Sequence, residues 1–112
     1  MNLQIEKKQP GLEIIRISGR IDPLTSSRLE EQLNQVIAAG SFRLIANLQE
    51  VNFISSSGLR VFLSVLKKVK AQNGDLKICC LDANVQKIFK IAGFVSLSDI
   101  VETEEEAIQK FA

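Results

Sequence analysis

The sequence contains no histidine, tryptophan or tyrosine, and only two cysteines among its 112 residues. Without histidine, a serine or cysteine nucleophile that depends on an imidazole base is excluded, and the commonest ligand of zinc, copper and non-haem iron is missing. A net charge of +1 also lacks the strongly basic balance of proteins that bind the phosphate backbone. We therefore expect no metal site, no cofactor and no direct contact with nucleic acid.

Long apolar runs are absent as well. No stretch approaches the roughly 18 apolar residues of a membrane-spanning helix, and residues 1–9 lack the apolar segment of a signal peptide. We expect a cytoplasmic protein without membrane insertion. The composition, 46% hydrophobic and 24% charged, is that of an ordinary globular protein, and the length predicts one domain over residues 1–112.

The two cysteines, Cys79 and Cys80, are adjacent in a predicted strand. Neighbouring side chains of a strand point to opposite faces, which disfavours a disulfide between them. Because no CxxC motif or four-ligand spacing accompanies them, we interpret both as small buried apolar residues.

The order of elements predicts an α/β fold. Residues 3–7 and 12–18 have the pattern of two strands around the Pro10–Gly11 turn, which indicates an antiparallel hairpin. Asp22 and Pro23 then have the residue types of a helix cap and a first helical position, and helical spacing continues to Gly40.

Strand and helix alternate along the rest of the chain, which predicts parallel strands joined by right-handed crossovers. The helices are expected to cover mainly one face of the sheet. The predicted strands span residues 42–48, 76–81 and 95–100, and the predicted helices span residues 57–72 and 82–92, followed by a C-terminal helix capped by Thr103.

Residues 51–60, VNFISSSGLR, combine a strand exit, three serines and a glycine before a helix. Functional residues of such sheets lie beyond the carboxyl ends of the strands. One of Ser55, Ser56 and Ser57 is needed only to cap the helix. A GxSxG elbow and a phosphate-binding glycine loop are both absent. The remaining interpretation is a phosphorylated serine at a helix N-terminus, where free N–H groups favour an anion.

The hairpin, the GRID segment at residues 19–22 and NFISSSGLR at residues 52–60 resemble the STAS domain of bacterial anti-sigma factor antagonists. The resemblance covers essentially the whole chain. It implies a small mixed sheet, with the hairpin followed by parallel strands and about four helices mainly on one face. It also implies a non-enzymatic partner switch that regulates transcription indirectly. In that switch the unphosphorylated antagonist binds an anti-sigma factor that is also a serine kinase with a histidine-kinase-like ATPase fold. Phosphorylation by the kinase releases the antagonist, and a PP2C-type phosphatase resets it.

The resemblance places the phosphoacceptor on Ser56, with Ser55 and Ser57 as alternatives. The family often has aspartate where this chain has Asn47 and Ser55. Arg60 is interpreted either as a contact to a partner carboxylate or as a solvated charge. The expected partner-binding residues are Asp22, Thr25, Ser26, Asn52, Ser55, Ser56, Ser57, Gly58, Leu59 and Arg60.

A second hypothesis follows from the two missing aspartates. On this hypothesis the chain is a non-switching STAS subunit of a lipid-transport ABC system or of a signalling scaffold. A small enzyme that uses Asp22, Glu50 and Asp82 is less well supported, because isolated carboxylates near strand ends are more simply helix caps and surface charges.

Overall fold

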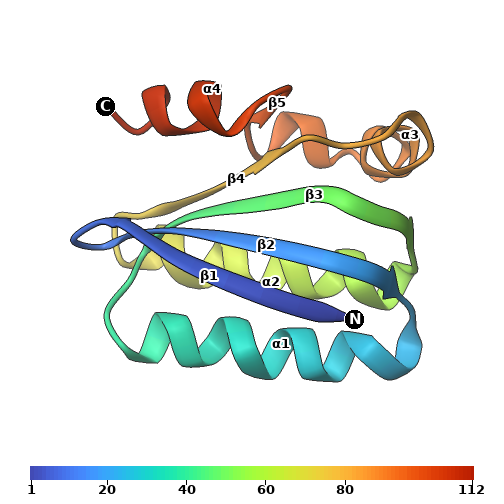
Figure 1. Ribbon diagram of the computed structural model, residues 1–112, viewed down its shortest axis with the longest axis horizontal. Helices are drawn as coiled ribbons and strands as arrows, with labels where there is room; N and C mark the ends of the chain where they lie inside the picture. The colour runs from blue at the N-terminus through green and yellow to red at the C-terminus, as the bar shows by residue number, and fades with distance from the viewer.

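The computed structural model describes residues 1–112 and consists of one five-stranded sheet with helices on both sides (Figure 1). The strand order is β1-β2-β3-β4-β5; β1 is antiparallel to β2, and all other neighbours are parallel. The predicted α/β fold, with a hairpin followed by parallel strands, is confirmed. The elements are β1 (Asn2–Gln9), β2 (Leu12–Ile21), α1 (Pro23–Ala38), β3 (Arg43–Ile54), α2 (Ser56–Ala71), β4 (Asp75–Cys79), α3 (Ala83–Ile91), a 3-10 turn (Phe94–Ser96), β5 (Ile100–Val101) and α4 (Glu104–Gln109).

The main core lies on the sheet face that α1 and α2 cover (Figure 1). Strand side chains alternate between the faces, so Ile15 and Ile17 of β2 enter this core while Ile14 points to the other face. Helix α3 joins the main core through Phe89, whose ring lies 6.0 Å from that of Phe62. Three of the four helices therefore share one core, in agreement with the predicted one-sided packing.

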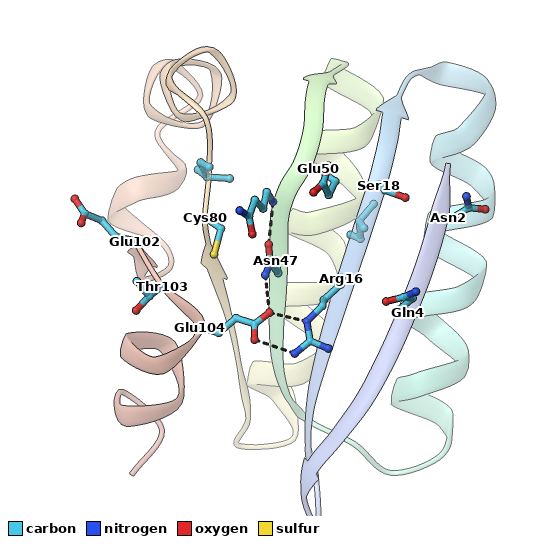
Figure 2. Close-up of a pocket in the computed structure, with 13 residues that line it drawn as sticks. Asn2, Gln4, Arg16, Ser18, Asn47, Glu50, Cys80, Glu102, Thr103 and Glu104 are labelled. Carbon is cyan, nitrogen blue, oxygen red and sulfur yellow. Dashed lines mark hydrogen bonds and ion pairs between the residues drawn. The ribbon is translucent and has the colours of Figure 1, made fainter.

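The opposite face carries a smaller apolar cluster beneath α4, formed by Leu12, Ile14, Ile45, Cys79 and Ala107. The remainder of this face, toward the carboxyl ends of the strands, is an open polar concavity (Figure 2). None of the helices is long and apolar enough to cross a membrane.

Several predicted strand boundaries are wrong. Strand β2 continues to Ile21 rather than ending at residue 18, and β4 ends at Cys79 rather than at residue 81. Strand β3 continues to Ile54 rather than ending at residue 48, because Val51 and Ile54 maintain the buried side of the strand after the apolar run stops. The predicted strand 95–100 is replaced by the 3-10 turn Phe94–Ser96, which follows Gly93, and a short irregular segment; only residues 100 and 101 pair with β4. A left-handed backbone at Gly93, with φ +75°, turns the chain away from an extended path.

The expectation for the cysteines also needs correction. Cys80 lies just after β4 and has a φ of +66°, which breaks the alternation of side chains. Its Sγ lies 3.4 Å from Sγ of Cys79, so the two thiols are neighbours rather than on opposite faces. Cys79 is fully buried as expected, Cys80 is half-buried, and both are free thiols.

In addition to the apolar cluster, one carboxylate attaches helix α4 to the sheet. Glu104 accepts two hydrogen bonds from Arg16, from Nε at 2.8 Å and Nη2 at 2.9 Å, and a third from Nδ2 of Asn47 at 2.5 Å (Figure 2). The hydrogen-bonded Arg16 guanidinium holds the pKa of Glu104 below its usual value, and partial burial opposes this effect. Asn47 therefore lies in the middle of β3 and faces α4, not at a strand end.

Acid is expected to weaken this attachment. Because the pKa of Glu104 is lowered in the folded state, its stabilisation is fully present above about pH 4.5 and is lost as the pH falls through the folded-state pKa. We expect Glu104→Gln to lower the free energy of unfolding at pH 7 by about 1 kcal/mol, and the difference to shrink below pH 4.5. Urea unfolding across this range measures it. Glu105→Gln, an exposed neighbour in the same helical turn, is the control; an equal loss in both variants would contradict the prediction.

The side-chain amide of Asn47 donates a hydrogen bond to the Glu104 carboxylate, which an aspartate carboxylate at this position could not do. Asn47 is only 8% exposed, so Asn47→Asp would place a second carboxylate against Glu104 in a poorly hydrated position. We expect a loss of about 1 to 2 kcal/mol at pH 7 that diminishes in acid, when one carboxylate binds a proton. Thermal melts at pH 7 and pH 4 check this, with the exposed Asn52→Asp on the same strand as control. A pH-independent loss would indicate a packing defect instead.

Candidate functional site

The N-termini of α1 and α2 lie at the same edge of the sheet, beyond the carboxyl ends of β2 and β3 (Figure 1). Asp22 caps α1: its Oδ1 accepts hydrogen bonds from the backbone N–H groups of Leu24, at 3.0 Å, and Thr25, at 2.9 Å. The Thr25 hydroxyl in turn accepts from the N–H of Asp22 at 2.9 Å. The backbone hydrogen bond from Thr25 is the main cause of the lowered pKa of Asp22. The predicted cap is therefore present.

A chain of hydroxyl groups joins the two helix starts. Oγ of Ser55 caps α2 by accepting from the N–H of Gly58 at 3.2 Å, and it lies 2.8 Å from Oγ of Ser57. Oγ of Ser57 also lies 3.1 Å from Oγ of Ser26, which donates to the carbonyl of Asp22 at 2.7 Å. Ser55 and Ser57 are thus occupied in holding the edge together.

Ser56 differs from its two neighbours. It is the first residue of α2, its side chain is exposed, and its hydroxyl makes no hydrogen bond within the chain. The free N–H groups of the first helical turn and the positive end of the helix dipole lie beside it. Of the three loop serines, Ser56 alone combines an exposed side chain with an unoccupied hydroxyl.

Gly58 permits the close approach of α2 to the sheet. A Cβ at this position would lie 2.6 Å from Cγ2 of Ile21 and 2.8 Å from Cγ1 of Ile54, at the ends of β2 and β3. Both contacts are to branched side chains, which are stiff near the backbone. Gly58 and Ser26, both predicted to bind a partner, are buried, and their contacts position the edge.

The exposed part of the edge continues into a groove of about 640 Å³ between α1 and α2. Arg60, Lys67 and Lys68 line the groove from α2, and Glu30 lines it from α1. Arg60 is exposed and forms no ion pair within the chain, so it is free to contact a ligand or partner. Leu59 is half-buried against the main core, whereas Asn52 and Arg60 are exposed.

Leu24 was not among the predicted partner-binding residues. Its side chain is 87% exposed, beside the α1 cap, which places a large apolar group on the candidate docking edge. The sequence signal was an apolar residue outside the buried stripe of α1, which consists of Leu29, Leu33 and Val36. A single exposed apolar side chain is common on protein surfaces, so Leu24 adds apolar area to the edge without marking it as an interface.

The carboxylates considered for an enzyme do not form a site. Asp22 caps α1, and Asp82 caps α3 through a hydrogen bond from the N–H of Val85 at 2.8 Å. Glu50 lines the polar concavity on the opposite sheet face (Figure 2). The three side chains belong to separate local structures.

A family model described as "STAS domain" matches residues 4–107. The chain belongs to the STAS-domain family. Among curated relatives, the anti-sigma-B factor antagonist of Bacillus subtilis is 33% identical over 110 residues, which cover 97% of this chain and 100% of that protein. The anti-sigma F factor antagonist of Paenibacillus polymyxa is 29% identical over 110 residues, with 96% and 94% covered.

Solved structures share the fold. The anti-sigma factor antagonist SpoIIAA in its unphosphorylated form matches with a TM-score of 0.86 at 24% identity, covering 98% of this chain and 96% of that one. The phosphorylated form of SpoIIAA from Bacillus matches with a TM-score of 0.77 at 23% identity, covering 99% and 100%. This STAS domain therefore has the same arrangement of elements over its whole length.

The role of Gly58 can be tested by adding one methyl group. Helix propensity alone predicts that Gly58→Ala stabilises α2 by up to about 1 kcal/mol, whereas the contacts with Ile21 and Ile54 predict overpacking. We expect the clash to dominate, with a net loss of about 2 kcal/mol and a fall in Tm of roughly 8 °C. Calorimetry measures the change. Ser64→Ala in the same helix is the control, and a stabilised Gly58→Ala protein would overturn this account of the loop.

Proposed function

We propose that this STAS domain is an anti-sigma factor antagonist that works by partner switching in the cytoplasm. The unphosphorylated domain binds an anti-sigma factor that is also a serine kinase, through the edge formed by the N-termini of α1 and α2. The kinase then phosphorylates Ser56 and the complex dissociates; a PP2C-type phosphatase restores the binding form. The domain itself catalyses nothing. The observation that carries this proposal is the exposed, unbonded hydroxyl of Ser56 at the first position of α2.

Phosphorylation at this position suits a switch because it breaks no hydrogen bond within the domain. A phosphate adds a charge of about −1.5 to −2 beside free backbone N–H groups, which stabilise an anion. Arg60 lies four residues further along α2, one helical turn away, where it is able to pair with the phosphate. A partner that packs on this edge would have to desolvate the phosphate or oppose its charge. A penalty of ~3 to 4 kcal/mol corresponds to a several-hundred-fold loss of affinity.

The names of the relatives support the proposal. The two curated relatives are anti-sigma factor antagonists, and SpoIIAA, which shares the fold, has been solved in unphosphorylated and phosphorylated forms. Leu24, next to the α1 cap, and Arg60, in the first turns of α2, are exposed apolar and cationic groups at the two helix N-termini.

The missing aspartates give little support to a non-switching subunit. Asn47 lies in mid-strand, bound to Glu104 on the opposite face of the sheet from α1 and α2. Ser55 caps α2, and serine is about as effective at that position as aspartate. Both departures are thus compatible with the same docking edge and the same acceptor.

Incubation with the cognate kinase and ATP tests the switch directly. We expect intact mass to show one phosphate and peptide mapping to place it on Ser56. Ser56→Ala should abolish the modification, whereas Ser55→Ala and Ser57→Ala should retain it while losing roughly 1 kcal/mol of stability each, because they break hydrogen bonds of the edge.

Binding provides the second readout. Calorimetric titration of the kinase should give a Kd roughly several hundred times weaker for the phosphorylated protein than for the unphosphorylated one. Ser64→Ala, further along α2, is the control for general surface effects. Full phosphorylation of Ser56→Ala on another serine would refute the acceptor assignment, and unchanged affinity after phosphorylation would refute the switch.

A further inference from the structure

The two cysteines form a second candidate site, on the sheet face opposite α1 and α2. Their Sγ atoms are 3.4 Å apart. Cys79 is buried in the apolar cluster beneath α4, whereas Cys80 is half-buried and lines the open concavity of about 890 Å³. Figure 2 shows Cys80 among the residues that line this concavity, which also include Asn47 and Glu104.

The backbone holds the two thiols in this arrangement. Cys80 has a φ of +66°, an uncommon conformation for a residue with a side chain. Its N–H donates to the carbonyl of Val101 at 3.3 Å, and the N–H of Ile78 donates to the carbonyl of Asp99 at 2.9 Å. The segment that carries β5 therefore fixes both ends of the cysteine pair, and the thiols are adjacent before any ligand arrives.

The distance between the two sulfur atoms indicates which bonds the pair can form. Neighbouring Cα atoms are about 3.8 Å apart across a trans peptide, below the usual range for a disulfide. For metal–sulfur bonds of about 2.3 Å, a tetrahedral ion needs its sulfurs about 3.8 Å apart and a linear ion about 4.6 Å. At the observed 3.4 Å, the angle at an atom bonded to both sulfurs by bonds of about 2.3 Å is about 95°. That angle is typical of a pyramidal, three-coordinate centre with a lone pair.

We propose that Cys79 and Cys80 form a vicinal dithiol site for trivalent arsenicals. With an organoarsenic oxide, two As–S bonds form as the arsenic–oxygen bonds and the two S–H bonds break. Both thiol protons leave with the oxide oxygen as one water molecule, and no atom changes its oxidation state. The third substituent of the arsenic occupies the concavity beside Cys80, which is open to solvent. The site is separate from the Ser56 edge and does not depend on the proposed function.

Burial raises the pKa of the Cys79 thiol, with the hydrogen bond from Cys80 as a further cause. Cys79 is therefore a neutral thiol near pH 7 and a poor nucleophile toward alkylating agents. An arsenic oxide, by contrast, removes both thiol protons as water in the bridging reaction. Maleimide should consequently label Cys80 and leave Cys79 unmodified in the folded protein.

Phenylarsine oxide tests the site in the intact protein. Native mass spectrometry should show one phenylarsenic group per chain with the loss of both thiol hydrogens. Excess monothiol should leave the adduct in place, and a small 1,2-dithiol should remove it. In Cys80→Ser and Cys79→Ala, the single remaining As–S bond should be displaced by monothiol at least about ten times faster, because the chelate is lost. Cys80→Ser changes a half-buried residue and so remains informative if Cys79→Ala folds poorly.

An unfolded chain with adjacent cysteines also chelates arsenic, so a thermal melt supplies the decisive comparison. Because the folded protein holds the two thiols in position, the arsenical should bind it more tightly than it binds the unfolded chain. The adduct should therefore raise Tm. A lowered Tm, labelling only in urea, or monothiol-resistant adducts on Cys80→Ser would each overturn the proposal.

Discussion

The candidate docking edge of this domain depends on the close approach of α2 to the ends of β2 and β3. Residue 58 has no side chain, so the first turn of α2 packs directly on Ile21 and Ile54. The N–H of Ser55 donates to the carbonyl of Ile21 at 2.8 Å and fixes the chain where it leaves the sheet. This contact sets where the free N–H groups of α2 point and brings Ser57 within 3.1 Å of Ser26 on α1. The N-termini of α1 and α2 thereby form one continuous surface.

The same strands build a different structure on their other side. Along β2, Ile15 and Ile17 enter the main core, while Arg16 lies between them and points to the face that α4 partly covers. Arg16 donates to Glu104 and Glu6, so one guanidinium links α4, β2 and β1. Arg16 also lies near Asn47, which completes the hydrogen bonds of Glu104. An amide suits this position better than a carboxylate, and the choice of residue 47 therefore reflects the attachment of α4.

Local signals predicted much of this fold. Asp22 with Pro23 marked the start of α1 and Asp82 that of α3, because capping depends on residues within one helical turn. Interactions between distant residues were not predictable: Arg16 and Glu104 are 88 positions apart. The extension of β3 past Leu48 was also missed, because buried residues recur there only at Val51 and Ile54 and the exposed residues between them are polar. The left-handed backbone of Cys80, whose N–H donates to the carbonyl of Val101, was not signalled by any local pattern either.

The family resemblance predicted Ser56 as the acceptor, with Ser55 and Ser57 as alternatives, but residue type alone could not divide the roles, since each serine can cap a helix. The division follows from hydrogen bonding. A phosphate on Ser55 would remove the cap of α2, and one on Ser57 would break the bridge to α1, so either modification would disturb the edge itself. A phosphate on Ser56 breaks no existing hydrogen bond. In the proposed switch, the effect of the modification would therefore fall on whatever binds the edge, because the hydrogen bonds that hold the edge together stay in place.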